Sequence, residues 1–364
     1  MGKLHDLAGL GQAIWFDYIQ RSLISSGELA RLIEQGVRGV TSNPTIFEKA
    51  IAGSRDYDDA LRRSAKAGKS TMEIYEELVL RDILLTSDLF LPVYVETRGQ
   101  DGYVSLEVSP ELAYDTEKTV IEGRRLFDAL DRPNVMIKVP ATDAGIAAVE
   151  ELISQGVNVN VTLLFSISQY IKAAQAYLAG LEKRLAAGLE ISSLASVASF
   201  FVSRVDTSVD AELERAGNRE LLGKAAIANA KIAYAHFKEI FSGSRWEHLA
   251  GSGAHVQRLL WASTGTKNPA YSKTLYVDKL IGPHTVNTLP PATLGMFLEH
   301  GQVSPTLDAG LEQAKEQIEK IKQLGINLDD ITARLEAEGV KSFAASFHAL
   351  INSISQKSSE VSKT

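Results

Sequence analysis

Eight short segments rich in β-branched or aromatic residues recur along the chain, and each is followed by a turn residue and a longer segment with helical spacing. They are residues 13–17, 39–41, 104–108, 135–139, 157–163, 196–202, 259–263 and 285–289. Strands that alternate with helices are typical of parallel sheets, because a parallel pair needs a long crossover connection. The pattern therefore predicts an α/β fold in which helices cover the sheet.

Polar residues within two of these segments indicate how the sheet closes. In residues 157–162 three valines alternate with Asn158, Asn160 and Thr162, so one face of this strand is polar. Lys138 likewise lies opposite the apolar face of its own strand. A parallel sheet covered by helices has no solvated face for such side chains. They must line a barrel interior or a site, and polar groups at the carboxyl ends of strands are typical of an α/β barrel.

The chain has 364 residues, more than the ~250 that are typical of an α/β barrel. Two long connections account for the excess. Residues 45–103 and 205–258 each have enough helical pattern for two or three helices, which predicts insertions in the loops of the barrel. Apolar residues at helical spacing continue from Leu328 to Ile354. We therefore expect one barrel domain over residues 1–354 and a flexible polar tail over residues 355–364.

The composition excludes several classes of protein. The chain has 45 acidic and 38 basic side chains, a formal net charge of -7, scattered histidines and no cysteine. It therefore offers no thiolate or histidine metal site, no disulfide and no broad basic surface for nucleic acid, although a few cations could hold a small anion. No signal peptide and no apolar run near the ~18 residues of a membrane span are present. We expect a cytoplasmic protein that binds no membrane.

Lys138 is the most informative single residue. Burial in an apolar strand disfavours a charged lysine and leaves a neutral amine that can attack a carbonyl. The alternative is a structural lysine that reaches water or pairs with a carboxylate. Asp17, Asn43, Glu107 and Thr162 occupy the ends of other predicted strands. Taken singly, Asp17 could be a cap and Glu107 a surface charge, but together with an amine these groups suit Schiff-base chemistry with separate proton carriers.

Five segments, taken together, resemble the transaldolase family, in particular its longer bacterial type. They are GVTSNPTIF at 39–47, SLEV at 105–108, IKVPAT at 137–142, NVTLLFS at 160–166 and SFFVSRVD at 199–206. The resemblance covers nearly the whole chain and implies a (β/α)8 TIM barrel with a C-terminal helix, from about Val340, over the site. It also implies transfer of a dihydroxyacetone unit between sugar phosphates in the pentose phosphate pathway, with no cofactor or metal, by a homodimer.

The resemblance further implies roles for individual residues. Lys138 would form a Schiff base with the ketose carbonyl, and Asp17 would take the proton of the C4 hydroxyl so that the C3–C4 bond breaks. Glu107 and Thr162 would move, through a water, the protons of carbinolamine dehydration. Three polar residues would hold the substrate hydroxyls and the retained three-carbon unit: Asn43, Asn160 and Ser199.

Two cations are expected to bind the substrate phosphate. Arg204 resembles the phosphate-binding arginine of the family, and the alternative for it is an ion pair with Asp206. Lys267 stands near the point where better-known members have arginine, so it would supply the charge without the bidentate fork. Ser263, at the end of the seventh predicted strand, would add a hydroxyl.

Phe201 separates two enzymatic alternatives. It shares strand parity with Ser199, so we expect it to point into the site. The related fructose 6-phosphate aldolases, which release free dihydroxyacetone, tend to have a tyrosine there whose phenol can protonate the enamine. Because phenylalanine cannot donate that proton, Phe201 favours a transferase. A catalytically silent barrel used for binding is a third alternative, and the intact set of catalytic residue types argues against it.

Overall fold

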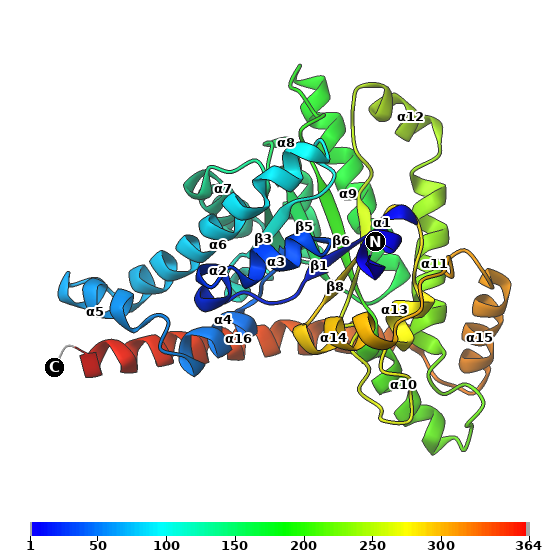
Figure 1. Ribbon diagram of the computed structural model, residues 1–364. Helices are drawn as coiled ribbons and strands as arrows, with labels where there is room; N and C mark the ends of the chain where they lie inside the picture. The colour runs from blue at the N-terminus through cyan, green and yellow to red at the C-terminus, as the bar shows by residue number, and fades with distance from the viewer. Residues whose placement is uncertain (1, 362–364) are drawn as a thin grey trace.

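The computed structural model describes residues 2–361, and its eight strands form one closed parallel barrel in sequence order (Figure 1). The strands are β1 (Gln12–Phe16), β2 (Val37–Thr41), β3 (Tyr103–Glu107), β4 (Val135–Pro140), β5 (Val159–Leu164), β6 (Ser196–Phe201), β7 (Arg258–Ala262) and β8 (Thr285–Leu289). All eight predicted strands are confirmed, with ends within two residues of those expected. Strand β8 pairs with β1 and closes the barrel.

Helices surround the barrel and fill both long connections. They are α1 (Lys3–Gly9), α2 (Arg21–Ser25), α3 (Glu28–Glu34), α4 (Pro44–Gly53), α5 (Asp58–Lys66), α6 (Thr71–Glu96), α7 (Thr116–Leu130), α8 (Asp143–Ser154), α9 (Ile167–Ala186), α10 (Ser203–Arg215), α11 (Ala225–Ile240), α12 (Ser244–Gly251), α13 (Leu275–Lys279), α14 (Pro291–His300), α15 (Leu311–Gln323) and α16 (Leu328–Val361), with a 3-10 turn η1 (Pro110–Leu112). Helices α4 to α6 and α10 to α12 lie within the two connections that were predicted to hold insertions. Among the helices of residues 2–361, none combines the length and the apolar character that a membrane crossing needs.

Hydrogen bonds between strands that are not neighbours show which face points inward. Asn160 on β5 donates from Nδ2 to Ser105 Oγ on β3 at 3.0 Å, although β4 lies between these strands. The hydroxyls of Thr41 on β2 and Thr288 on β8 are 2.6 Å apart, with β1 between them. Both bonds must therefore cross the interior. The polar alternation read in the sequence marks the inside of the barrel.

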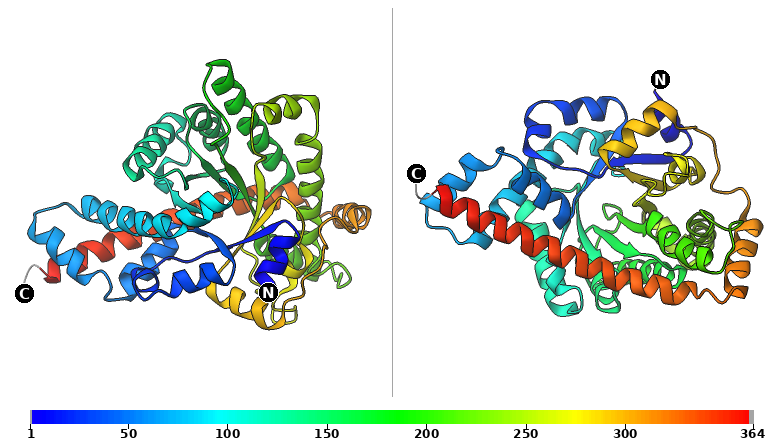
Figure 2. Two further views of the ribbon diagram at one scale, coloured as in Figure 1. Left: turned by 45° about the horizontal axis from the view of Figure 1, so that its top comes forward. Right: turned by 90° about the horizontal axis from the view of Figure 1, so that it is seen from below.

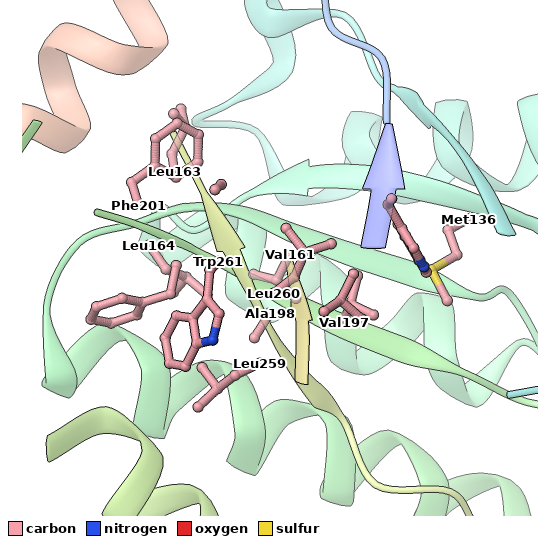
Figure 3. Close-up of a cluster of buried hydrophobic side chains, with 14 of the residues drawn as sticks. Met136, Val161, Leu163, Leu164, Val197, Ala198, Phe201, Leu259, Leu260 and Trp261 are labelled. Atoms are coloured by element: carbon pink, nitrogen blue, oxygen red, sulfur yellow. The ribbon is translucent and has the colours of Figure 1, made fainter. Parts of the chain in front are cut away.

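The strand positions that alternate with these polar residues form the apolar layer beneath the helices. Figure 3 shows this layer on β5, β6 and β7, where Val161, Ala198 and Trp261 gather in one buried cluster. On the inward face, Met136 and Val197 are equally buried. Since both faces of the sheet are covered, apolar burial holds the barrel rigid around its polar end.

The backbone is irregular at two carboxyl ends of strands. Leu163 and Ser263 have φ of 60° and 55°, a region that residues with a side chain seldom adopt. The pairing of β5 with β6 shifts register between Val161 and Leu164, as at a β-bulge. Bulges of this kind change the direction of nearby side chains and are common beside active sites.

The C-terminal helix α16 runs across the barrel, as the right-hand view in Figure 2 shows. Its Gly339 lies against Leu163 at the end of β5, where a Cβ would be 2.9 Å from the leucine side chain. Residues 355–361, for which a flexible polar tail was expected, continue the helix. Lys357 Nζ donates to the carbonyls of Ile51 at 2.8 Å and Ser54 at 2.7 Å, which ties this last part of α16 to α4. Residues 362–364 lie outside the described part of the chain.

Gly145 gives a test of how tightly β4 and α8 are joined. A Cβ at Gly145 would lie 1.9 Å from the carbonyl oxygen of Pro140, the last residue of β4. We expect Gly145→Ala to lower the free energy of unfolding by about 1–3 kcal/mol, because the helix must shift away from the strand. Urea denaturation would measure this.

Gly295 in α14 provides the matched control, since a Cβ there would meet no atom within 4 Å. Gly295→Ala should leave stability unchanged or raise it by up to about 1 kcal/mol, because alanine is the better helix former. Equal effects of the two substitutions would contradict the close contact at Gly145.

Candidate active site

A cavity of about 810 Å³ opens at the carboxyl ends of the strands. Nine of the eleven residues predicted for the site line it: Asp17, Asn43, Lys138, Thr162, Ser199, Phe201, Arg204, Ser263 and Lys267. The remaining two, Glu107 and Asn160, are buried and contact residues of the lining. The structure therefore brings all eleven to one end of the barrel, at the edge where parallel strands commonly carry a site.

Lys138 on β4 is only 4% exposed, so it does not reach bulk water. Its Nζ donates to the carbonyl of Ser42 at 3.1 Å and lies 3.2 Å from Glu107 Oε2 on the neighbouring strand β3. The aromatic ring of Phe343, from α16, is 5.6 Å from the same nitrogen. Pairing with a carboxylate, one of the alternatives considered for Lys138, is thus present. The partner is Glu107, which was itself expected to take part in proton transfer.

Glu107 is 7% exposed and is not the surface charge that it could have been. Burial raises the pKa of its carboxyl group, and the positive charge of Lys138 opposes that rise. If Lys138 loses its charge, the opposing effect disappears and Glu107 becomes a stronger base. The pair can therefore exchange a proton within the barrel, which general acid–base chemistry requires.

Asp17, directly after β1, accepts a hydrogen bond from the Thr41 hydroxyl at 2.6 Å rather than capping a helix. Burial raises the pKa of Asp17, while this hydrogen bond and the charge of Lys138 lower it. A carboxylate whose pKa is raised holds a proton more readily, so Asp17 is suited to act as a base. The Thr41 hydroxyl also contacts Thr288, so the carboxylate is held by a fixed group.

Consecutive hydrogen bonds link Ser199, Asn160 and Ser105 inside the barrel. Ser199 Oγ donates to Asn160 Oδ1 at 2.7 Å, and the Asn160 amide donates to Ser105. These bonds fix the orientation of the amide next to Lys138, its register partner across β4 and β5. Thr162 differs, because its buried Oγ1 has no hydrogen-bond partner within residues 2–361 although the residue lines the cavity. This hydroxyl is available to a water or a substrate.

Arg204, at the start of α10, forms the cationic end of the cavity. Its guanidinium lies 5.4 Å from the centre of the Phe201 ring and has no ion pair with any residue from 2 to 361. The alternative partner, Asp206, instead accepts from the Ala226 amide at 2.7 Å and the Tyr276 hydroxyl at 2.9 Å. Burial lowers the pKa of Arg204. The charge of Glu338 on α16 opposes this shift, but Glu338 forms no ion pair with Arg204 within the described residues. A partly buried guanidinium without an ion pair favours an anionic ligand.

Among the lining residues that sequence reasoning missed, three bear on the charge and the enclosure of the cavity. Lys49 on α4 and Lys273 before α13 add positive charge, and Phe343 on α16 closes the wall above Lys138. Phe343 belongs to a segment that the family resemblance reached, so it could have been proposed. The two lysines lie in connections whose path the strand pattern does not fix, and no sequence signal pointed to them.

The ion pair between Lys138 and Glu107 predicts a pH-dependent loss of stability. Lys138→Met leaves Glu107 buried without its cation, which raises the carboxyl pKa further and makes the native state hold a proton that the unfolded chain releases. Stability should then fall as pH rises. Breaking a buried pair in this way costs about 3–5 kcal/mol. Urea denaturation at about pH 5 and about pH 8 should show the larger loss at the higher pH.

The double variant Lys138→Met/Glu107→Gln is the control. It removes both charges, so it should recover most of the lost stability and should show little dependence on pH. A Lys138→Met variant whose loss were the same at both pH values would show that Glu107 does not depend on this cation.

Comparisons with known proteins agree with this site. The chain matches the family model described as Transaldolase/Fructose-6-phosphate aldolase over residues 14–354. It is 49% identical over 368 residues to the Transaldolase of Trichodesmium erythraeum, with 97% of each chain covered. It is also 49% identical over 351 residues to the Transaldolase of Neisseria gonorrhoeae, covering 96% of this chain and 99% of that one. The Transaldolase of Thiobacillus denitrificans is 49% identical over 358 residues, covering 97% and 100%. The chain therefore belongs to the transaldolase/fructose-6-phosphate aldolase family.

Proposed function

We propose that this chain is a transaldolase of the pentose phosphate pathway. It moves a dihydroxyacetone unit from sedoheptulose 7-phosphate to glyceraldehyde 3-phosphate, giving erythrose 4-phosphate and fructose 6-phosphate. The observation that carries the proposal is the buried Lys138 amine beside Glu107, in a cavity that also holds the base Asp17 and the unpaired cation Arg204. This set supplies a nucleophile, two proton carriers and a phosphate partner.

The first step is formation of a Schiff base. Lys138 transfers a proton to Glu107, and the neutral amine attacks the ketose carbonyl. The carbinolamine then loses water, with Glu107 returning the proton to the leaving oxygen. The free hydroxyl of Thr162 holds the water through which this proton passes. The 3.2 Å separation of Lys138 Nζ and Glu107 Oε2 supports direct exchange between the two groups.

The second step breaks the C3–C4 bond. Asp17 takes the proton of the C4 hydroxyl, the C4 oxygen forms a carbonyl, and the bonding electrons move to the iminium to give an enamine on Lys138. The aldose phosphate leaves and the second aldehyde enters, after which the same steps run in reverse. Asn43 and Ser199 in the wall, with Asn160 fixed beneath them, hold the hydroxyls of the retained unit.

The substrate phosphate binds at the end of the cavity that carries Arg204 and Lys267, with Ser263 beside them. The planar guanidinium of Arg204 can donate two parallel hydrogen bonds and so orient the phosphate. Lys267 adds a positive charge without this directional contact. Lys49 and Lys273 line the same cavity and add to its positive charge.

Phe201 supports transfer over release of free dihydroxyacetone. Its ring packs 5.1 Å from that of Phe165 and lies beside Arg204, so the position has no proton to give the enamine. Tyr18 lines the same cavity, but its hydroxyl donates to Gln20 Oε1. Without a phenol at position 201 to protonate it, the enamine persists until the second aldehyde arrives.

Borohydride trapping tests the function directly. Incubation with fructose 6-phosphate followed by reduction should leave a three-carbon adduct on Lys138, found by peptide mass mapping. Addition of erythrose 4-phosphate before reduction should remove the adduct and yield sedoheptulose 7-phosphate. Lys138→Met should show no adduct. Decay of the adduct to free dihydroxyacetone would favour an aldolase, and no adduct at all would favour a binding protein.

Asp17→Asn separates the two chemical steps in the same assay. Without the base the Schiff base still forms, so reduction should trap a six-carbon adduct on Lys138 in place of the three-carbon one. Turnover should fall by about 100-fold or more, the contribution typical of a general base. A three-carbon adduct in this variant would show that another group removes the C4 proton.

The phosphate assignment is tested by Arg204→Gln. Loss of one charge-assisted interaction of about 1.5–3 kcal/mol should raise KM for fructose 6-phosphate by roughly ten- to hundredfold. Arg204→Lys should be intermediate, since it keeps the charge and loses the fork. Unphosphorylated fructose is the control, because its KM should not change. An equal effect on both sugars would place Arg204 outside the phosphate site.

The family resemblance also supports two proposals that lie outside the site. The chain acts in the cytoplasm and forms a homodimer. Light scattering of the purified protein should give twice the 39.5 kDa of the chain.

A further inference from the structure

A second cavity, of about 520 Å³, lies on the flank of the barrel. It is enclosed by α11, by α15 and by the segment from residue 270 to the start of α13. Helices α11 and α15 pack side by side, as Figure 1 shows at its right edge. None of the residues that line this flank cavity lines the active-site cavity. Its volume is within the range of small-molecule sites, about 300–1,000 Å³.

The flank cavity concentrates positive charge. Lys224, Lys231 and Lys279 line it, and no aspartate or glutamate does. Within residues 2–361, Lys224 and Lys279 form no ion pair and no side-chain hydrogen bond. Lys231 is held in place, since its Nζ donates to the carbonyls of Thr306 at 2.9 Å and Ala309 at 2.5 Å. Although the chain carries a net charge of -7, the lining of this cavity is basic, with no acidic side chain among its residues.

Two acidic residues near the flank cavity already have partners of their own. Asp308 pairs with Lys238, and Asp210 accepts from the Tyr271 hydroxyl at 2.7 Å. Burial lowers the pKa of Lys231, the charge of Lys279 lowers it further, and the charge of Asp308 opposes these two effects. The lysines therefore repel one another, and an anion between them would remove that repulsion.

The rest of the lining suits an organic body attached to the anion. Ile227 and Leu275 provide apolar surface, Tyr271 provides a ring, and Gln313 and Gln317 provide amides. An inorganic ion alone would leave this surface uncovered. A phosphorylated small molecule would use the cations for its phosphates and the apolar wall for its body.

The segment between β7 and α13 lines both cavities. Lys267 and Lys273 face the active site, whereas Tyr271 and Ser272 face the flank cavity. The Thr266 hydroxyl donates to the carbonyl of Ser272 at 2.9 Å, which ties the two sides of the segment together. A ligand that fixes one side must therefore affect the position of the other.

We propose that the flank cavity is a second, non-catalytic binding site for a phosphorylated small molecule with two or more negative charges, and that its occupancy is coupled to the active site through residues 263–275. The coupling is reciprocal, since a ligand that changes the affinity of one site for its ligand has its own affinity changed by the same factor. The binding site itself does not depend on the proposed transaldolase activity.

Isothermal titration calorimetry at low salt tests the site, with pyrophosphate and ADP as probes and adenosine as the uncharged control. Because both probes can also bind the active-site cations, the titrations are made in an Arg204→Gln/Lys267→Gln background. We expect one remaining site per chain for each charged probe and none for adenosine. Adding Lys224→Gln/Lys279→Gln should weaken binding by about tenfold or more.

A charge-matched control is Lys66→Gln/Lys322→Gln, which changes two exposed lysines outside the lining of both cavities and should leave the affinity unchanged. The proposed binding site would be overturned if Lys224→Gln/Lys279→Gln bound the charged probes as tightly as its background does. It would also be overturned if the control variant lost as much affinity. Calorimetry needs no turnover, so an inactive chain would still give this result.

The coupling is tested on the otherwise unchanged chain. ADP should shift KM for fructose 6-phosphate, and the shift should disappear in Lys224→Gln/Lys279→Gln, whose KM without ADP should equal that of the unchanged chain. A shift that persisted in this variant would show that ADP acts at the active site, and binding without any shift would overturn the coupling.

Discussion

The buried pair of Lys138 and Glu107 is the interaction on which the rest of the site depends. Two charges inside a barrel lose their hydration, and this cost is recovered only if each group keeps a close partner. Adjacent strands β3 and β4 place the two residues in register, and the Ser42 carbonyl takes a further proton of the lysine. The close contact that compensates for the lost hydration of the two charges also allows a proton to pass between Lys138 and Glu107 without solvent.

The remaining polar groups support this pair by fixed hydrogen bonds across the barrel. Thr41 holds Asp17 and contacts Thr288, while Asn160 is fixed by Ser105 of β3 and Ser199 of β6. Apolar layers on both faces of the strands keep these groups in one geometry. Helix α16 adds to the enclosure, because the Phe343 ring lies 5.6 Å from Lys138 Nζ and helps to bury this lysine. A site built in this way is preorganised before substrate enters.

Charge is distributed unevenly in this molecule. The chain is acidic overall, yet several cations line the active-site cavity and three more line the flank cavity. One segment, from Ser263 to Leu275, passes between the two groups. Exposed lysines lose little by facing water, so they are free to serve ligands instead of the fold. Negative charge elsewhere on the surface leaves these two places as the attractive ones for small anions.

The sequence by itself determined the barrel, its eight strands and the position of each predicted site residue at one end, because strand alternation and parity are local properties of the chain. It also determined the family, since the motifs lie within the strands. Tertiary structure alone decided that Glu107 is the partner of Lys138, that Asn160 bonds across the interior, and that Lys49 and Lys273 reach the site. It decided too that residues 355–361 continue α16. Contacts between segments far apart in sequence depend on how loops and helices pack, and no local pattern encodes that packing.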